Sequence, residues 1–224
     1  MRAAHGLVLL LGLTACNSMP TESSSLRYVA LGDSYTIGTS VSSSESWPAQ
    51  LTARVPALQL VANLGVNGYA TDDLIADELP QLADQRPEFV TLLIGVNDVV
   101  RGVPEQHYAA NLVLILDELL GRLPADRILC VATPDYTVTS QGAAFGSPEQ
   151  QRAGIVAFNR RLGEACAARD IRFVPEIFEI SEAAASDRSL VADDGLHPSG
   201  SQYALWVDAI QPVVEELLLP SADR

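Results

Sequence analysis

The sequence predicts an α/β fold in which a parallel sheet carries helices on both faces. Short, almost continuously apolar runs alternate along the 224 residues with longer stretches of helical spacing, and this alternation is typical of βα units. Hydrophobic residues make up 48% of the chain, enough for a sizeable core. A chain of this length fits one large domain, and no internal repeat or change of composition divides it. We therefore expect a single folded domain over residues 27–224.

Five apolar runs have the length and the continuous hydrophobicity of strands that are buried on both faces. They are residues 28–31, 58–62, 89–94, 128–132 and 171–174. Helical spacing of apolar residues is clearest over 108–119 and over the final segment 203–217, where Pro212 is expected to kink or split the helix. The one long irregular connection is 134–148.

The first residues have the pattern of a secretory signal. Arg2 precedes the apolar run 6–13, and small residues then lead to Cys16. The apolar run is too short to span a bilayer as a permanent helix. Export is therefore expected.

The segment Leu13-Thr14-Ala15-Cys16 resembles a bacterial lipobox. The resemblance implies that residues 1–15 are a lipoprotein signal peptide and that Cys16 carries the lipid, with plain cleavage as the alternative. The small polar residues of 16–26 would form a flexible tether. We expect a periplasmic or cell-surface protein that is held to a bacterial membrane by this N-terminal anchor.

The chain is strongly acidic, with a net charge of −14 and no lysine. Such a surface repels the phosphates of nucleic acids, so no nucleic-acid partner is expected. Two cysteines remain beyond the signal segment, Cys130 and Cys166. Export would permit a disulfide between them, but Cys130 lies in an apolar, strand-like run, which favours a buried free thiol.

A possible nucleophile, Ser34, lies just after the first predicted strand in Gly32-Asp33-Ser34-Tyr35. Parallel sheets bind ligands outside the carboxyl ends of their strands, where a nucleophile is useful. Gly32 allows a sharp turn, and a helix that follows Ser34 would aim its backbone N–H groups at developing negative charge. Taken alone, such a segment is more often an ordinary turn.

His197 is the histidine best placed to act as a general base. A serine nucleophile needs an imidazole to accept its proton, and His107 lies in the opening turn of an amphipathic helix, where a solvated side chain is expected. Asp194 lies three residues before His197, a spacing that can bring its carboxylate onto the imidazole Nδ1. Asp193 competes for this role but has the shorter reach. The segment 193–198 is also typical of a helix start, with Pro198 in the first turn and the acidic residues before it.

Two further segments could supply donors to an oxyanion, which a serine mechanism requires. Gly68, after the second predicted strand, can present a backbone N–H with no side chain in the way. Asn97, after the third, can donate from its side-chain amide. Each segment alone is more often a plain turn, so the inference rests on their joint arrangement with Ser34.

In these four blocks the sequence resembles the SGNH hydrolases, also called GDSL lipases and esterases. The resemblance implies that Ser34, Asp194 and His197 are catalytic and that Ser34, Gly68 and Asn97 form the oxyanion hole. It further implies a three-layer α/β/α sandwich with a five-stranded parallel sheet of the flavodoxin-like kind, with no metal and no cofactor.

This resemblance runs from about Tyr28 to the final helix, and Tyr35 replaces the leucine of the family's name. It implies a serine ester hydrolase that works through an acyl-enzyme on a small-molecule or lipid ester. Short connections favour an open site, so we expect a lysophospholipase or short-chain esterase type. A carbohydrate O-acetylesterase of the same family is the alternative.

Two hypotheses from other classes remain. One is a non-catalytic lipoprotein that uses this scaffold to bind a sugar or lipid. The other is a metal hydrolase, because carboxylates and one histidine can hold a divalent ion. Its ligands would come from Asp33, Asp98, Asp193, Asp194 and His197.

Overall fold

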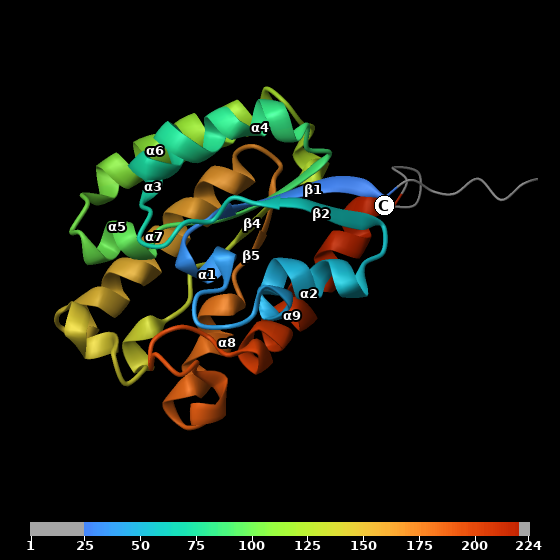
Figure 1. The fold of residues 1–224 in the computed structure, drawn as a ribbon. Coiled ribbons are helices and arrows are strands. Elements are labelled where there is room, and N and C mark those ends of the chain that lie inside the picture. Colours follow the sequence, from blue (N-terminus) through green and yellow to red (C-terminus); the bar gives the residue numbers. More distant parts are fainter. Residues whose placement is uncertain (1–24, 220–224) are drawn as a thin grey trace, which may run out of the picture.

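Five parallel strands form one sheet between two layers of helices in a computed structural model of the protein, which describes residues 25–219 (Figure 1). The strand order is β2-β1-β3-β4-β5, and every neighbouring pair is parallel. The predicted sandwich is confirmed. The strands are β1 (Leu26–Gly32), β2 (Leu58–Asn63), β3 (Phe89–Leu93), β4 (Ile128–Val131) and β5 (Arg172–Val174).

Helices connect the strands and cover both faces of the sheet. A π-helical turn, Leu74–Glu78, joins the third helix to the fourth. Within residues 25–219 the α-helices are α1 (Ser34–Ile37), α2 (Trp47–Arg54), α3 (Thr71–Asp73), α4 (Leu79–Gln85), α5 (Val96–Val100), α6 (Glu105–Leu120), α7 (Pro148–Ala167), α8 (Ile177–Glu182) and α9 (Gly200–Leu218).

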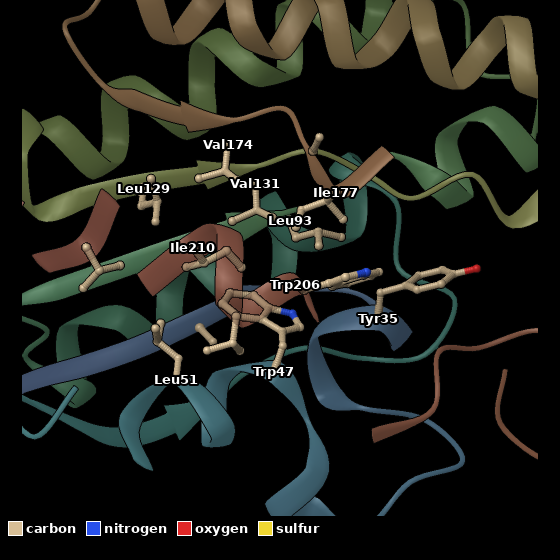
Figure 2. Packing of buried hydrophobic residues seen from close by; sticks show 14 of the residues in the cluster. Tyr35, Trp47, Leu51, Leu93, Leu129, Val131, Val174, Ile177, Trp206 and Ile210 are labelled. Atoms are coloured by element: carbon tan, nitrogen blue, oxygen red, sulfur yellow. The ribbon is translucent and has the colours of Figure 1, made fainter. Parts of the chain in front are cut away.

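Each face of the sheet has its own apolar core. Successive side chains of a strand point to opposite faces, so Tyr28 of β1 enters one cluster and Val29 enters the other. On the first face, α2 and α9 bury Trp47 and Trp206 completely (Figure 2). The second face is covered by α4, α6 and α7. Burial on both faces explains why the central strands β1, β3 and β4 are almost continuously hydrophobic, whereas the edge strands β2 and β5 are only partly buried.

The predicted strands differ from the observed ones by one or two residues at their ends. The first, β1, begins at Leu26, inside the range expected for the tether. Pro212 was expected to kink or split the last helix; it does not split it, because α9 continues through the proline. The proline ring is exposed, while buried Ile210 and Val214 hold the helix on the core on either side of it, which offsets the missing hydrogen bond.

Cys130 in β4 and Cys166 in α7 are both buried free thiols. Their mutual contact, together with burial, raises the pKa of the Cys130 thiol well above its usual value. The thiols thus pack as small apolar groups in the second core.

The expected signal peptide, Cys16 and all but the last residues of the expected tether lie outside the described residues, as do residues 220–224. Among residues 25–219, no helix has both the length and the hydropathy needed to cross a membrane.

Candidate active site

The carboxyl ends of β1, β2 and β3 bring three of the predicted segments together. The chain passes from β1 to β2 on one side and then to β3 on the other, and ligands of open α/β sheets bind at such a switch point. Ser34 follows β1, Gly68 follows β2 and Asn97 lies in α5 after β3. Together with His197 they line one cavity of about 200 Å³.

The turn from β1 into α1 depends on Gly32 and Asp33. Gly32 has a φ of +149°, and a Cβ there would lie 2.1 Å from the carbonyl oxygen of Leu93. Asp33 caps α1 by accepting a hydrogen bond from the Tyr35 N–H at 2.9 Å. These constraints place Ser34 at the first position of α1, with only 7% of its surface exposed.

Ser34, His197 and Asp194 are joined by hydrogen bonds. The Oγ of Ser34 lies 2.9 Å from Nε2 of His197, and Nδ1 of His197 lies 2.6 Å from Oδ2 of Asp194. The other carboxylate oxygen, Oδ1, accepts from the backbone N–H groups of Leu196 and His197, each at 2.9 Å. Asp194, and not Asp193, therefore meets the imidazole.

A fourth residue, Ser40, completes the contacts of Asp194. Its hydroxyl donates to Oδ2 at 2.6 Å. Partial burial raises the pKa of Asp194, but the hydrogen bonds from Ser40, His197 and Leu196 outweigh burial and hold the pKa well below its usual range. Asp194 is ionised at neutral pH, as a group that stabilises an imidazolium must be. Sequence reasoning missed Ser40, because no motif marks it.

Tyr35, at the position of the family leucine, packs against the imidazole. Its ring centroid lies 5.0 Å from that of His197, and on its other side it stacks on Trp206 at 6.4 Å. A buried aromatic ring therefore supports the histidine from the core.

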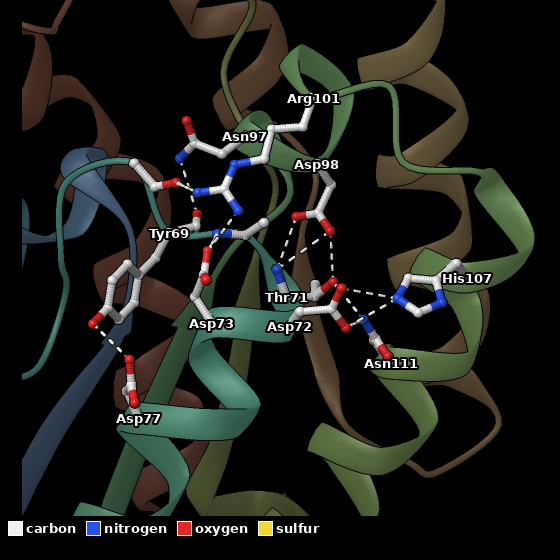
Figure 3. Close-up of polar contacts among 12 residues, drawn as sticks. Tyr69, Thr71, Asp72, Asp73, Asp77, Asn97, Asp98, Arg101, His107 and Asn111 are labelled. Atoms are coloured by element: carbon white, nitrogen blue, oxygen red, sulfur yellow. Dashed lines mark hydrogen bonds and ion pairs between the residues drawn. The ribbon is translucent and has the colours of Figure 1, made fainter.

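The two segments with possible oxyanion donors are tied to each other (Figure 3). The side-chain amide of Asn97 donates to the Tyr69 carbonyl at 2.9 Å, which leaves its second N–H available. Arg101 donates to the Gly68 carbonyl at 2.6 Å and pairs with Asp73 at 2.7 Å. Arg101 is a second residue that sequence reasoning missed.

Asp98 anchors α5 to α3 rather than entering the cavity. It is fully buried and accepts hydrogen bonds from Thr71, from the backbone N–H at 3.0 Å and from Oγ1 at 2.5 Å. Burial raises its pKa above the usual value. Asn111 donates to Thr71 Oγ1 at 2.9 Å, so a buried polar network lies behind Asn97 (Figure 3).

His107 lies outside the cavity, at the end of this network where Asp72 also binds Asn111. Half of its side chain is exposed, as expected of a solvated residue, but its Nε2 also lies 2.9 Å from the Asp72 carboxylate. The imidazole that meets Ser34 is that of His197.

The irregular stretch 134–148 supplies part of the cavity wall. Tyr136 and Phe145 both line it and meet edge to face, with ring centroids 5.7 Å apart. Val96, Val100 and Leu196 add further apolar surface. The predicted irregularity of this stretch was the only available signal, and it did not single out either aromatic residue.

Two buried carboxyl groups lie beneath the Ser34 turn. Burial raises the pKa of Asp33 to about 7 and that of Glu78 to about 9. Oε2 of Glu78 accepts from the Gly32 N–H at 2.9 Å, whereas Oε1 has no hydrogen-bond partner among the described residues. At neutral pH Glu78 is therefore a neutral acid in contact with the turn.

Within residues 25–219 no three side chains of the His, Cys, Asp and Glu types are grouped as metal ligands would be. Asp33 caps α1 and Asp98 holds Thr71. The residues named as possible metal ligands thus make separate structural contacts.

The sequence model of the GDSL-like lipase/acylhydrolase family matches residues 30–205. The chain belongs to this family. The resemblance inferred from the four sequence blocks is therefore confirmed, and the protein is an enzyme of the GDSL hydrolase class.

Curated relatives of this GDSL hydrolase include esterase TesA of Pseudomonas aeruginosa, 22% identical over 94% of this chain and 98% of the esterase. Thioesterase 1/protease 1/lysophospholipase L1 of Escherichia coli K12 is 25% identical over 82% of this chain and 83% of its own length. Among solved structures, the acetylxylan esterase Axe2 of Geobacillus stearothermophilus matches with a TM-score of 0.67 at 19% identity, over 85% of this chain and 94% of Axe2. At this identity the likeness shows the fold alone.

Proposed function

We propose that this GDSL hydrolase cleaves carboxylic esters, with Ser34 as nucleophile, His197 as general base and Asp194 as the group that orients it. The observation that carries the proposal is the continuous relay from Ser34 Oγ to His197 Nε2 at 2.9 Å and from Nδ1 to Asp194 Oδ2 at 2.6 Å. Serine is too weak a nucleophile without such a base. The relay opens into a cavity in which an ester can lie.

In the first half-reaction, Ser34 Oγ attacks the ester carbonyl carbon while His197 Nε2 takes the hydroxyl proton. The carbonyl oxygen becomes an oxyanion and accepts hydrogen bonds from the backbone N–H groups of Ser34 and Gly68 and from the Asn97 amide. The tetrahedral intermediate then collapses, the carbon–oxygen bond to the alcohol breaks, and His197 protonates the leaving oxygen. The product that remains is an acyl ester of Ser34.

In the second half-reaction, water attacks the acyl carbon and gives a proton to His197. The bond to Ser34 Oγ breaks, and His197 returns the proton to Ser34. A free carboxylic acid leaves, and the enzyme is restored. The negative charge of Asp194 stabilises the imidazolium at each tetrahedral intermediate.

The cavity favours a lysophospholipase or short-chain esterase type of substrate. Its volume of about 200 Å³ and its apolar wall of Tyr35, Tyr136 and Phe145 suit an acyl or aryl group rather than a polar sugar ring. The curated relatives named above carry the names esterase and lysophospholipase. A carbohydrate O-acetylesterase remains the second candidate within the family, supported by the shared fold of Axe2.

One panel tests class and substrate together. Wild type and Ser34→Ala are compared on p-nitrophenyl esters of increasing chain length, lysophospholipids, and acetylated xylo-oligosaccharides. Ser34→Ala should lower kcat by roughly 10⁴- to 10⁶-fold with unchanged folding, because triad members act as a unit. A fluorophosphonate probe should label wild type only.

The outcomes of the panel are distinct. Turnover of acetylated sugars alone would move the proposal to the O-acetylesterase. An unlabelled, inactive wild type would favour the non-catalytic binding lipoprotein. Wild-type activity in Ser34→Ala would contradict the serine mechanism. Loss of activity in the presence of a chelator, with recovery when metal is added, would favour the metal hydrolase.

The aromatic wall gives the substrate proposal its own test. Phe145→Ala should raise the relative kcat/KM for acyl chains longer than those wild type prefers, since it removes a ring from the cavity wall. Val156→Ala, an exposed apolar residue of α7 outside the cavity, is the matched control. An unchanged chain-length profile in Phe145→Ala would remove this wall from acyl recognition.

We also propose that the chain is exported and anchored through a lipid on Cys16. The support is the sequence pattern of residues 1–16 alone. Expressed with its signal in a bacterial host, wild type should sediment with membranes and partition into detergent, and Cys16→Ser should not. Equal distribution of the two proteins would contradict the anchor.

A further inference from the structure

Ser40 adopts a backbone conformation that is unfavourable for its residue type. Its φ is +68°, and within residues 25–219 only two other non-glycine residues, Arg86 and Asp170, have a positive φ. A side chain in the left-handed region is strained by its own Cβ. Such strain gathers at functional sites, where the surrounding structure holds it. Ser40 meets that description, because its hydroxyl contacts Asp194.

The two residues before Ser40 are hydrogen-bonded to the backbone of Ser34. The N–H groups of Gly38 and Thr39 both donate to the Ser34 carbonyl at 3.1 Å. Thr39 Oγ1 donates to Asn67 Oδ1 at 2.5 Å, next to Gly68. With the two preceding residues held in place, the left-handed conformation of Ser40 directs its hydroxyl toward Asp194.

The two oxygens of Asp194 are held in different ways. Oδ1 is held by backbone N–H groups within its own loop. Oδ2 accepts from His197 Nδ1 at 2.6 Å and from Ser40 Oγ, also at 2.6 Å. Ser40 is thus the donor to this oxygen that comes from outside the loop of the acid and base.

We propose that Ser40 is a positioning residue for the reaction, because its hydroxyl fixes the Asp194 carboxylate against the imidazole through a strained turn. The inference rests on the proposed serine mechanism. When the hydroxyl is absent, Oδ2 keeps one donor, the carboxylate can rotate, and the acid and base align less often with Ser34.

The Ser40 hydroxyl also affects the negative charge of Asp194 that faces His197. The Ser40 hydroxyl stabilises the charge of Asp194 by a hydrogen bond. The other titratable groups around that carboxylate are His197, the phenols of Tyr35 and Tyr203, and Asp193. Loss of the Ser40 donor changes both the alignment and the charge of the carboxylate that faces the imidazole. Because the base must be neutral to act, the acid limb of kcat/KM should be displaced from its position in wild type.

Two variants separate the hydroxyl from the strain. Ser40→Ala removes the hydroxyl and keeps the strained Cβ, whereas Ser40→Gly removes both. Each should lower kcat roughly three- to tenfold, as expected for an exposed hydrogen bond to a charged group, with KM within about twofold. The melting temperature of Ser40→Gly should equal or exceed that of Ser40→Ala. In both variants the acid limb of kcat/KM should be displaced from its position in wild type.

Asp170→Gly is the matched control, because it relieves a left-handed residue at an exposed turn after α7. It should leave kcat and the pH profile unchanged. A purely structural role for Ser40 predicts instead that kcat follows stability, so that Ser40→Gly regains wild-type activity.

Wild-type kcat in Ser40→Gly, or an unmoved acid limb in both Ser40 variants, would overturn the inference. The Ser34→Ala result identifies which proposal has failed. An active Ser34→Ala defeats the serine mechanism, whereas an inactive Ser34→Ala beside fully active Ser40 variants defeats only the role of Ser40.

Discussion

Arg101 donates a hydrogen bond from Nη2 to the carbonyl oxygen of Gly68 at 2.6 Å, while its Nη1 pairs with Asp73. The arginine comes from the turn that ends α5, the helix of Asn97. It therefore links the two segments to which we assign the oxyanion donors. This contact leads to the first prediction.

Arg101→Met should lower kcat by about tenfold, with little change in KM, because the loss of a charged hydrogen bond frees the Gly68 turn. Arg101→Lys should recover part of the activity, since an ammonium can replace one of the two contacts but not both. Steady-state kinetics on a short-chain ester measure the changes in kcat and in KM separately. The control is Arg122→Met, whose guanidinium bonds to Glu118 one turn away, and an equal loss there would deny Arg101 a positioning role.

Asn97→Ala should lower kcat by about 10²- to 10³-fold, the usual cost of removing one oxyanion donor. Its bond to substrate strengthens mainly in the transition state, so KM should change far less. A boronate mimics the tetrahedral intermediate, so the affinity of Asn97→Ala for a boronate should fall in proportion to its kcat. An effect confined to KM would place Asn97 outside the oxyanion hole.

Gly68→Ala and Gly102→Ala form a matched pair. Both glycines have a positive φ, +83° and +69°, and a Cβ at either position meets nothing within 4 Å. Each substitution should therefore destabilise the fold by about 1 kcal/mol through backbone strain alone. Only Gly68→Ala should also lower kcat, because it alone displaces an oxyanion donor. Thermal melts and kinetics on both variants test this, and equal kcat values would contradict the assignment.

Glu78→Gln should flatten the pH dependence of stability between about pH 4.5 and pH 9. Burial raises the Glu78 pKa to about 9 in the folded protein, whereas the unfolded chain loses this proton near pH 4.5. Between these values the folded state holds the extra proton, so the free energy of unfolding falls as pH rises, by up to roughly 1.4 kcal/mol per pH unit. Below pH 4.5 the group contributes no such loss.

Glutamine keeps an oxygen for the Gly32 N–H but cannot ionise. The variant should therefore gain stability over wild type steadily from pH 5 to pH 9, as measured by denaturant unfolding across this range. Glu118→Gln, on the exposed face of α6, is the control. A difference between Glu78→Gln and wild type that does not vary with pH would show that Glu78 ionises normally.

Sequence patterns predicted the strands well because burial on both faces leaves a simple signature, as in 89–94 against β3. They did not show that α9 would continue through Pro212, where packing of the helix outweighs the local cost of proline. The sequence pointed to Ser34 because it follows a predicted strand, to His197 because few histidines were available, and to Asp194 because it lies three residues before His197.

The sequence did not point to Ser40, Arg101 or Phe145. Ser40 and Asp194 are 154 residues apart, and their contact exists only when two loops meet. Arg101 acts on a carbonyl oxygen, which every residue has and which no motif can mark. Phe145 reaches the cavity because the irregular stretch after β4 folds back over it.

Local hydrogen bonds hold the acid and the base of the Asp194–His197 loop together. The carboxylate accepts from the backbone and the ring of the same four-residue segment, and a bridge between Val191 and Pro198 closes the loop at its base. Acid and base thus form one local unit, to which Ser40 adds a hydrogen bond from outside the loop, whereas the contact between His197 and Ser34 depends on how this loop packs against α1. Moderate heating should therefore uncouple the nucleophile while the acid–base pair stays assembled, so that activity falls before the sheet melts.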